Sequence, residues 1–566
     1  MPAPISVLIL TLNHERTLRN CLESVSWSDD IVVFDSFSTD GTVEIAKAFG
    51  ARVVQRKFDS EYDLRAASLA FEFKHAWVCN PDADEIITPE LREEMFAAVN
   101  DPTQSNAAFR VRVKTMFMDK WLRHSGLYPT WALRLFRPEK ARIEHAVNLS
   151  VTSQGPIAPL RGQVERYAFR NGLTDWFTRH NWYSTEKARE LVDPPPVSWG
   201  DLFGSDPMRR RTALKNLSFH LSGRPLLVFF YLFLFRGGFL DGRRGLTYCT
   251  LRAVYEFQIN VKTLELRRKR AQALAGNAPA KAPPATPPAQ RPDCSVIILT
   301  LNEECNIPRC ISSVSWCDDV VVFDSGSTDR TAEVSEKMGA RVFYRKFDNY
   351  AAQRNAALTD VPYKHPWVLM LDADECTEDA LVPELAQAIG SCPPSMTLYR
   401  LRRKDYFLGR WIKSSSGFPT WFARIMKVGF VQFHREVHED AVAQGQVGVL
   451  QGFLTHQPFS KGVSDWFDRH NRYSQMEARM QLQKQESPPL RVLMQHGAST
   501  RRRLLKKLAY ALPGRPYLVF FYLYVCRLGL LEGRPGFIYC VLRGVYEFMI
   551  NVKIRELRRQ QKGLQS

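Results

Sequence analysis

The chain has 566 residues, of which 45% are hydrophobic and 24% charged, a composition typical of globular proteins that excludes a disordered or collagen-like chain. Its 77 Lys and Arg outnumber its 59 Asp and Glu, which gives a formal net charge of +18. This basic balance favours a polyanionic partner: a phosphorylated substrate, an anionic membrane or nucleic acid.

The N-terminus reads as the first strand of a domain. MPAPISVLILTLNHE has no basic segment, and its apolar run of about six residues is too short for the apolar part of a signal peptide. The eleven cysteines form no CxxC pair, so the pattern favours neither a zinc site nor a disulfide framework. We therefore expect reduced thiols and a cytoplasmic protein.

The second half of the sequence repeats the first, with a shift of 289 to 291 residues. The matching segments are TLNHE and TLNEE, VVFDSFSTDGT and VVFDSGSTDRT, PDADE and LDADE, DWFTRHNWYS and DWFDRHNRYS, and RPLLVFFYLF and RPYLVFFYLY. We predict a first repeat over 1–268, an extended Ala- and Pro-rich linker over 269–292, and a second repeat over 293–566.

Strand-like and helix-like segments alternate at the start of each repeat. In the second repeat the expected strands are 295–301, 319–325, 340–347 and 367–375, with helices over 306–314 and 331–339. This order predicts an α/β domain with a Rossmann-like, mostly parallel sheet and a ligand crevice at the carboxyl ends of its strands. TLNEE, DSGSTD and DADE all follow such ends.

Asp372 and Asp374 follow an apolar strand. If this segment is extended, the two carboxylates lie on one side of the chain and share a hard divalent cation, Mg²⁺ or Mn²⁺. An acidic surface turn is the alternative, but the pair recurs as Asp82 and Asp84. Asp324 ends the second strand, and we expect it to accept hydrogen bonds from a nucleobase or a ribose, whereas Thr328 and Asp329 suit helix capping.

Each repeat ends in a basic segment followed by an aromatic, apolar one. The apolar runs over 225–235 and 516–525 are 11 and 10 residues long, too short to cross a bilayer, which takes about 20. They predict amphipathic helices in the headgroup layer of an anionic membrane. Two such anchors bind better than one, and a buried core helix is the alternative.

With these motifs the sequence resembles the GT-A glycosyltransferases of family 2, most closely the bacterial lipopolysaccharide-core enzymes. The segments that carry the resemblance are TLNEE, DSGSTD, AAQRNAAL, LDADE, GFPTWFARI, REVHEDA and the C-terminal tail. The resemblance implies two tandem GT-A domains with helical tails, a nucleotide-diphospho-sugar donor (UDP-sugar being commonest), Mg²⁺ or Mn²⁺, and inversion. It also implies a glycolipid acceptor and a peripheral position on the inner face of the cytoplasmic membrane.

The resemblance also implies roles for residues of the second repeat. The residues expected to bind the nucleotide-sugar are Thr300, Asn302, Glu303, Asp324, Gln353, Arg354, Asn355 and Asp372. Those expected to bind the metal are Asp372 and Asp374. We predict Glu439 as the base that deprotonates the acceptor hydroxyl, and His438 as its supporting neighbour or a metal ligand. A solvated loop is the alternative for this pair, and His456 and His470 are weaker candidates.

The first repeat lacks the proposed base, because Val147-Asn148-Leu149 aligns with Val437-His438-Glu439. The first repeat has Phe37, Leu64, Ala66 and Arg166 in place of Gly326, Gln353, Asn355 and His456. The scaffold-like residues Trp131, Arg134, Asp175 and Tyr183 match Trp421, Arg424, Asp465 and Tyr473. We therefore expect a degenerate first repeat and a catalytic second one. Asp35, Arg65, Asp82 and Asp84 remain as a residual site.

Two other functions stay open from the sequence. In a bifunctional transferase both repeats would be active, with Glu144 or His145 as the base of the first. A noncatalytic protein that binds a nucleotide-sugar or a glycolipid is the alternative from another class. The sequence shows no nucleic-acid-binding module, so no nucleic-acid partner is expected.

Overall fold

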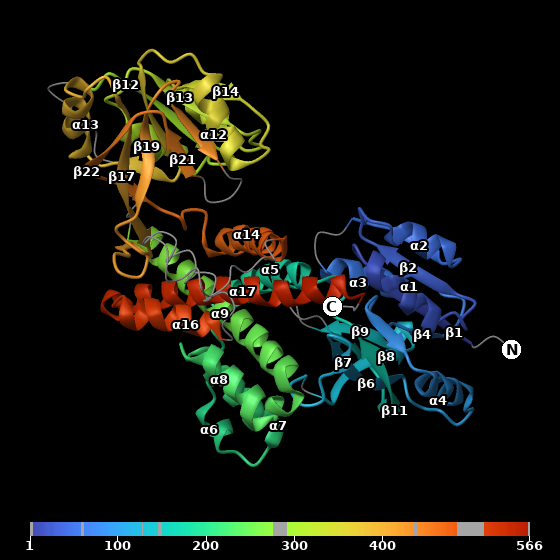
Figure 1. The fold of residues 1–566 in the computed structure, drawn as a ribbon. Coiled ribbons are helices and arrows are strands. Elements are labelled where there is room, and N and C mark those ends of the chain that lie inside the picture. The colour runs from blue at the N-terminus through green and yellow to red at the C-terminus, as the bar shows by residue number, and fades with distance from the viewer. Residues whose placement is uncertain are drawn as a thin grey trace. The chain divides into compact units, whose positions relative to one another are not determined.

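The computed structural model describes residues 4–57, 61–126, 128–144, 150–275, 291–434, 440–483 and 514–563. The chain forms two compact units (Figure 1). Unit 1 is Met1–Leu264 with His470–Pro489 and Met549–Ser566, and unit 2 is Glu265–Arg469 with Leu490–Phe548. Each unit thus contains the sheet of one repeat and helical segments of both.

The sheet of the first repeat has the order β3-β2-β1-β4-β8-β6-β11-β5, with β7 beside β6. β1 pairs in parallel with β2 and β4, and β2 with β3, whereas β8 is antiparallel to β4 and β6. The elements are β1 (Ile5–Thr11), α1 (Glu15–Ser24), β2 (Ile31–Asp35), α2 (Thr42–Ala48), β3 (Arg52–Gln55), α3 (Glu61–Leu69), β4 (Trp77–Cys79), β5 (Glu85–Ile87), α4 (Pro89–Asn100), β6 (Ala108–Phe117), β7 (Lys120–Trp121), β8 (Thr130–Phe136), β9 (Ala141–Glu144), β10 (Ser150–Ser153) and β11 (Ile157–Arg166).

The second repeat forms the same sheet, in the order β14-β13-β12-β15-β19-β17-β22-β16, with β18 beside β17. Its elements are β12 (Cys294–Thr300), α10 (Ile307–Ser313), β13 (Val320–Asp324), α11 (Thr331–Lys337), β14 (Arg341–Tyr344), α12 (Tyr350–Thr359), β15 (Trp367–Asp372), β16 (Glu375–Thr377), α13 (Leu381–Gly390), β17 (Met396–Phe407), β18 (Arg410–Trp411), β19 (Trp421–Lys427), β20 (Val431–His434), β21 (Asp440–Ala443) and β22 (Gln446–His456). The predicted α/β fold with two parallel-rich sheets is confirmed, with antiparallel strands added on one side of each parallel set.

The central strands of the second repeat are buried on both faces. Val296 of β12 and Val322 of β13 lie in the core on one face, and Ile297 of β12 and Val321 of β13 lie in the core on the other; none of them is exposed to solvent. Strands covered on both faces read as continuous apolar runs rather than alternating ones, which is why VIIL, VVVF and WVLML were recognisable as strands. Their polar carboxyl ends lie at one edge of the sheet.

The tails are helical. In the first repeat they are α5 (Leu173–Glu190), α6 (Trp199–Leu202), α7 (Pro207–Phe219), α8 (Arg224–Phe230), a π-helical turn over Tyr231–Phe235 and α9 (Gly242–Leu274). In the second they are α14 (Val463–Gln483), α16 (Arg515–Phe521), a π-helical turn over Tyr522–Cys526 and α17 (Gly533–Gln561). α9 extends past residue 268, where the linker was expected to start, because RRKRAQAL consists of good helix formers. Residues 276–290 of that linker lie outside the described residues.

The two long helices, α9 and α17, exchange their C-terminal ends between the repeats. Within unit 1, Glu556 of α17 accepts a hydrogen bond from the backbone N–H of Leu173 at 2.8 Å. Within unit 2, Glu265 of α9 accepts one from the backbone N–H of Val463 at 3.1 Å. Each unit is therefore completed by a helix end that belongs to the other repeat.

Within the described residues, no single helix is long and apolar enough to cross a membrane. The pair Arg224–Phe235 and Gly238–Leu274, bent by 75°, meets the length and composition requirements only when the two helices are taken together. All eleven cysteines are free thiols.

Candidate active site

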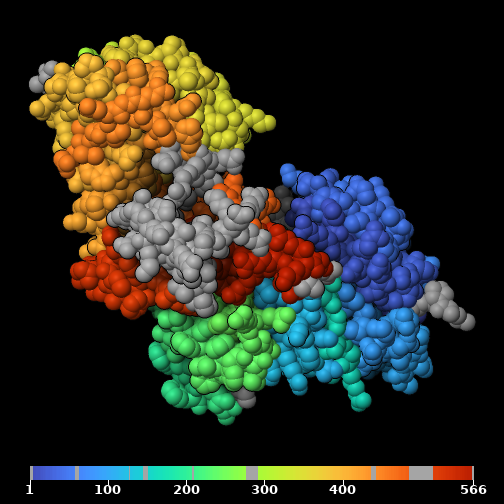
Figure 2. All heavy atoms as spheres, in the orientation of Figure 1, coloured from blue at the N-terminus to red at the C-terminus, as the bar shows by residue number. Residues whose placement is uncertain are grey.

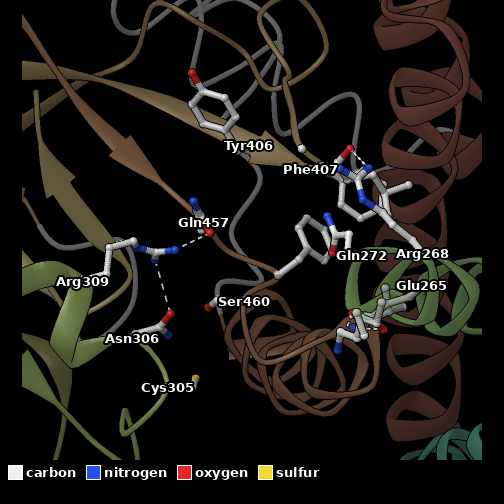
Figure 3. Close-up of a pocket in the computed structure, with 16 residues that line it drawn as sticks. Glu265, Arg268, Gln272, Cys305, Asn306, Arg309, Tyr406, Phe407, Gln457 and Ser460 are labelled. Carbon is white, nitrogen blue, oxygen red and sulfur yellow. Dashed lines mark hydrogen bonds and ion pairs between the residues drawn. The ribbon is translucent and has the colours of Figure 1, made fainter. Parts of the chain in front are cut away.

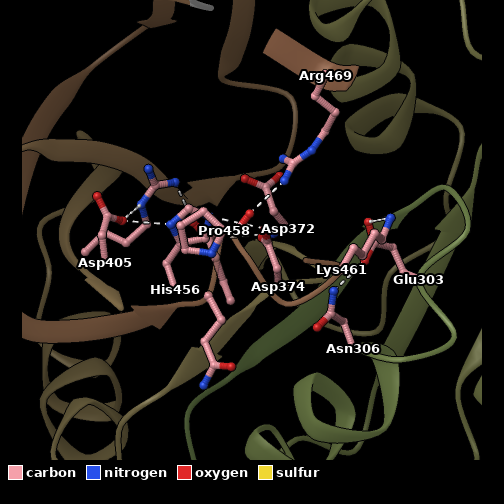
Figure 4. Close-up of polar contacts among 12 residues, drawn as sticks. Glu303, Asn306, Asp372, Asp374, Asp405, His456, Pro458, Lys461 and Arg469 are labelled. Carbon is pink, nitrogen blue, oxygen red and sulfur yellow. Dashed lines mark hydrogen bonds and ion pairs between the residues drawn. The ribbon is translucent and has the colours of Figure 1, made fainter. Parts of the chain in front are cut away.

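The candidate site lies at the carboxyl ends of β12, β13 and β15 in unit 2 (Figure 4). The TLNEE and DSGSTD segments are joined there by side-chain hydrogen bonds. Asn302, in the left-handed region at φ 54°, accepts from the backbone N–H of Thr328 at 2.7 Å. Asparagine tolerates this conformation better than most residues.

Asp324 organises this edge of the site. Its Oδ1 accepts hydrogen bonds from the hydroxyls of Thr300 at 2.8 Å and Ser327 at 2.5 Å. Its Oδ2 accepts from the backbone N–H groups of Gly326 at 3.0 Å and Ser327 at 2.7 Å. The carboxylate is thus buried with four protein donors and shapes the loop, and its contact with a nucleoside stays a prediction.

Glu303 lies beside these loops. It accepts hydrogen bonds from Lys461 at 2.5 Å and Asn306 at 2.7 Å. Burial raises the pKa of Glu303 although Lys461 acts to lower it. The side chain is thus held by two hydrogen bonds at the rim of the site.

Asp372 is held by two buried arginines. Its Oδ1 accepts from Arg354 at 2.9 Å and its Oδ2 from Arg424 at 2.7 Å. Burial alone would raise the pKa of Asp372, but the two guanidinium charges outweigh it and hold that pKa well below its usual range. Arg424 also donates to the buried Glu375 at 2.7 Å.

Asp374 has a different partner. Its Oδ2 lies 3.2 Å from Nε2 of His456, whose Nδ1 lies 2.7 Å from Oδ1 of Asp405 (Figure 4). Burial alone would lower the pKa of His456, but Asp374 and Asp405 raise it to about 9. The expectation that both DADE aspartates lie on one side of an extended strand is wrong, because β15 ends at Asp372 and a turn follows.

A cavity of about 260 Å³ opens over Asp372. Four arginines line it, namely Arg354, Arg400, Arg403 and Arg424. Guanidinium groups bind phosphate oxygens through paired hydrogen bonds, so this cavity has the charge and the donors to hold a diphosphate. Arg403 also lies 3.0 Å from Asp405, which connects the cavity to His456.

Gln353 and Asn355 have structural partners on either side of α12. Gln353 donates to Ser325 at 3.0 Å and accepts from Arg345 at 3.0 Å. Asn355 donates to the carbonyl of Phe433 at 2.9 Å and accepts from its N–H at 2.7 Å. Asn355 therefore fastens β20, the strand that leads into the predicted catalytic loop.

The predicted base Glu439 and its neighbour His438 lie outside the described residues. The strands on either side of them are described, and His434 of β20 pairs with Asp440 of β21. Among the described residues, no group of three or more His, Cys, Asp and Glu side chains has the geometry to hold a metal. Of the two DADE carboxylates, Asp374 is the one without an arginine partner in the described part of the chain, and it is of the ligand type that Mg²⁺ and Mn²⁺ prefer. His456 lies beside it as the second donor.

The residual site of the first repeat keeps part of this arrangement. Asp35 accepts from Thr11 at 3.0 Å, as Asp324 does from Thr300. Asp82 accepts a hydrogen bond from Arg134 at 2.7 Å, as Asp372 does from Arg424. The charge of Arg65 helps to lower the pKa of Asp82. Asp84 faces Arg166. His145 lies outside the described residues, as does the side chain of Glu144.

Sequence reasoning missed Arg403 and Asp405, took Arg424 for scaffold, and ranked His456 low. Arg403 and Asp405 occupy alternate positions of β17, so they lie on one face of it. Asp405 is in register with His456 of β22. The alternation of side chains in RRKDYF could have placed Arg403 and Asp405 on one face of a strand. The strand that pairs with it, however, cannot be predicted from a single sequence.

A larger cavity of about 1180 Å³ lies elsewhere in unit 2 (Figure 3). Glu265 and Arg268 of α9 line it together with Arg309, Phe407 and Gln457. None of the predicted site residues is among those that line this cavity.

The chain matches the model of glycosyl transferase family 2 over residues 6–154 and 295–442. It is 29% identical over 270 residues to the lipopolysaccharide core biosynthesis glycosyltransferase LpsC of Rhizobium meliloti, an alignment that covers 46% of this chain and 91% of LpsC. It is 26% identical to the uncharacterized glycosyltransferase RT0209 of Rickettsia typhi, over 33% of this chain and 68% of that protein.

Among solved structures, the chain is similar to glucosyl-3-phosphoglycerate synthase from Mycobacterium tuberculosis in complex with Mn²⁺, UDP and glucosyl-3-phosphoglycerate, with 25% identity and a TM-score of 0.18. That match covers 20% of this chain and 44% of the other, so it spans less than half of that structure. The family match over both repeats, on sheets of the same topology, shows that the chain belongs to glycosyl transferase family 2 and is a glycosyltransferase.

Proposed function

We propose that the second repeat transfers a sugar, with inversion, from a nucleotide-diphospho-sugar to a lipopolysaccharide-core or other cell-envelope glycolipid. The observation that carries this proposal is the arginine-lined cavity over Asp372, next to the Asp374–His456 pair. Its charge complements a diphosphate. UDP-sugars are the first donors to test, and the likeness to LpsC supports the acceptor class.

Asp374 and His456 are the residues that would hold Mg²⁺ or Mn²⁺. A bound divalent ion supplies positive charge against the leaving diphosphate. Asp405 fixes the ring of His456 through Nδ1, which directs Nε2 toward Asp374. The arginines of the cavity orient the diphosphate, and Glu439 takes the proton of the acceptor hydroxyl.

A membrane-bound acceptor is supported by two exposed apolar faces. Face 1 is Leu226, Leu227, Phe230, Tyr231 and Leu234, and face 2 is Tyr517, Leu518, Phe521, Tyr522 and Val525. In Figure 2 the segment of face 1 lies at the surface (green). Each face follows helical spacing and has arginines nearby. We propose that both contact anionic lipid at the cytoplasmic side of the inner membrane.

The test is a screen of donor hydrolysis and sugar transfer over nucleotide-sugars, with Mg²⁺ or Mn²⁺ and a lipid-core acceptor. We expect Asp374→Asn and Glu439→Gln each to lower turnover by about 100-fold or more, because each removes charge or base assistance. The matched first-repeat variant, Asp82→Asn with Asp84→Asn, should keep turnover. If that variant instead loses one of two products, both repeats are active and the chain is a bifunctional transferase.

A further inference from the structure

Arg166 occupies in the first repeat the place that His456 occupies in the second. β22 pairs His456 with Glu375, and β11 pairs Arg166 with Glu85. Glu85 and Glu375 are the last residues of the two DADE motifs. The two side chains therefore start from equivalent positions next to equivalent aspartates.

The guanidinium of Arg166 spans both aspartates of the first DADE. Its Nη2 lies 3.5 Å from Oδ2 of Asp82, and its Nε lies 3.5 Å from Oδ1 of Asp84. The side chain of Asp84 is only 6% exposed. The charge of Asp84 raises the pKa of Arg166 further above its usual range. A permanent positive charge thus faces the pair of carboxylates.

The residues around Arg166 also differ from those around His456. Thr115 is in register with Arg166 on β6, where Asp405 is in register with His456 on β17. The carboxylate that orients the imidazole in the second repeat is therefore absent from this position in the first. Val113 likewise stands where Arg403 contacts Asp405. The imidazole and the two groups that support it are replaced together.

These exchanges have a definite chemical consequence. A histidine releases its proton when it binds a metal ion and then offers a lone pair, whereas a guanidinium keeps its protons and has no acceptor atom. At the distances seen here it also repels a dication. We propose that Arg166 is a built-in cation of the first repeat, which fills the place of a divalent ion and keeps that repeat metal-free.

This inference rests on the proposed function in one respect, since it takes Asp374 and His456 of the second repeat as the reference metal site. The chain would then hold one divalent ion rather than two. The probe is Mn²⁺ alone, titrated into the full-length chain while electron paramagnetic resonance reports the free ion. Circular dichroism and thermal unfolding confirm that each variant is folded.

We expect the wild type to bind one Mn²⁺ and Asp374→Asn to bind none. In the Asp374→Asn background, Arg166→His with Thr115→Asp should gain one Mn²⁺, which a further Asp84→Asn removes. The matched control, Arg166→Lys with Thr115→Asp in the same background, should gain none, because lysine keeps the positive charge.

Two results would overturn the inference. One is a Mn²⁺ ion that persists in Asp374→Asn and disappears on adding Asp84→Asn, since Arg166 would then coexist with a metal. The other is a folded Arg166→His, Thr115→Asp variant that gains no site. The gained Mn²⁺ site is measured in the Asp374→Asn background, so its result does not depend on the proposed function. The proposed function fails on a different result, namely sugar transfer that survives Asp374→Asn.

Discussion

His180 is a residue whose protonation should affect the stability of unit 1. It stacks on Trp176 at 3.7 Å between ring centroids, and its Nδ1 lies 2.8 Å from the carbonyl of Trp176. Burial lowers the pKa of His180 to about 3. The unfolded chain takes up this proton below its ordinary pKa of about 6.5, so the folded state loses stability as the pH falls below that value.

We therefore expect unit 1 to lose about 2 kcal/mol of unfolding free energy through this residue between pH 7.5 and pH 5. Urea unfolding of the wild type and of His180→Gln at both pH values measures it. The variant should show a pH effect smaller by this amount. His220→Gln, at an exposed histidine, is the control. Equal pH effects in the wild type and His180→Gln would contradict the assignment.

Asn355 provides a second test at the residue scale. Asn355→Ala removes both hydrogen bonds to Phe433, and leaving such buried groups unpaired costs about 1–3 kcal/mol. We expect faster hydrogen exchange over residues 431–443, and turnover lowered by about tenfold with little change in donor KM. Thr359→Ala, at the exposed end of the same helix, should change neither. Unchanged exchange over 431–443 would show that Asn355 does not fasten β20.

At this scale the sequence predicted candidate site residues but not the hydrogen bonds that they make. Asp324, Asp372 and Asp374 were identified as candidates because each ends or follows an apolar strand. Their partners were not, since Arg424 and His456 come from β19 and β22, more than 50 residues further along the chain. Hydrogen bonds between distant strands depend on register, and a single sequence does not fix register beyond its hairpins.

At the scale of elements, the clearest feature is the solvent exposure of the two apolar faces. Leu226, Phe230 and Leu234 lie on one side of α8 and the turn after it, and they are 59%, 47% and 52% exposed. Leu518, Phe521 and Val525 repeat this at 49%, 54% and 40%. A core helix would bury such a stripe, so the buried core helix that the sequence left as the alternative does not fit the exposure of these faces.

We expect the chain to sediment with phosphatidylglycerol vesicles and much less with phosphatidylcholine vesicles, because its net charge is +18 and the exposed Arg209, Arg210 and Arg211 precede face 1. Serine at Leu226, Phe230 and Leu234 of face 1 should raise the lipid concentration for half binding by roughly tenfold. Serine also at Leu518, Phe521 and Val525 of face 2 should abolish binding. Phe203→Ser removes an exposed aromatic outside the faces and should have no effect. Binding that survives serine at all six positions would place the membrane contact elsewhere.

At the scale of the whole molecule, the exchange of helix ends makes each unit depend on residues of both repeats. The N-caps of α5 and α14 are Gly172 and Gly462, at φ 93° and 95°, a left-handed conformation that favours glycine. Glycine has no side chain to cap a helix, so an acceptor has to come from outside. Comparison of the two halves of the sequence revealed the repeats. The sequence of the linker, however, does not predict in which unit the C-terminal end of each long helix lies.

Glu556 supplies that acceptor to α5, and Glu265 supplies it to α14. Replacing either with alanine leaves a buried N–H unpaired at a helix start, at a cost of about 1–3 kcal/mol, which corresponds to roughly 10- to 100-fold faster local hydrogen exchange. We expect Glu556→Ala to accelerate exchange in the first turn of α5, within the first repeat, and to leave the first turn of α14 unchanged. Glu265→Ala should do the reverse, and glutamine at either position should have a smaller effect because it keeps an acceptor oxygen. If each variant instead accelerated exchange only in its own repeat, the helix ends would not be exchanged, and the two repeats would be separable at the linker.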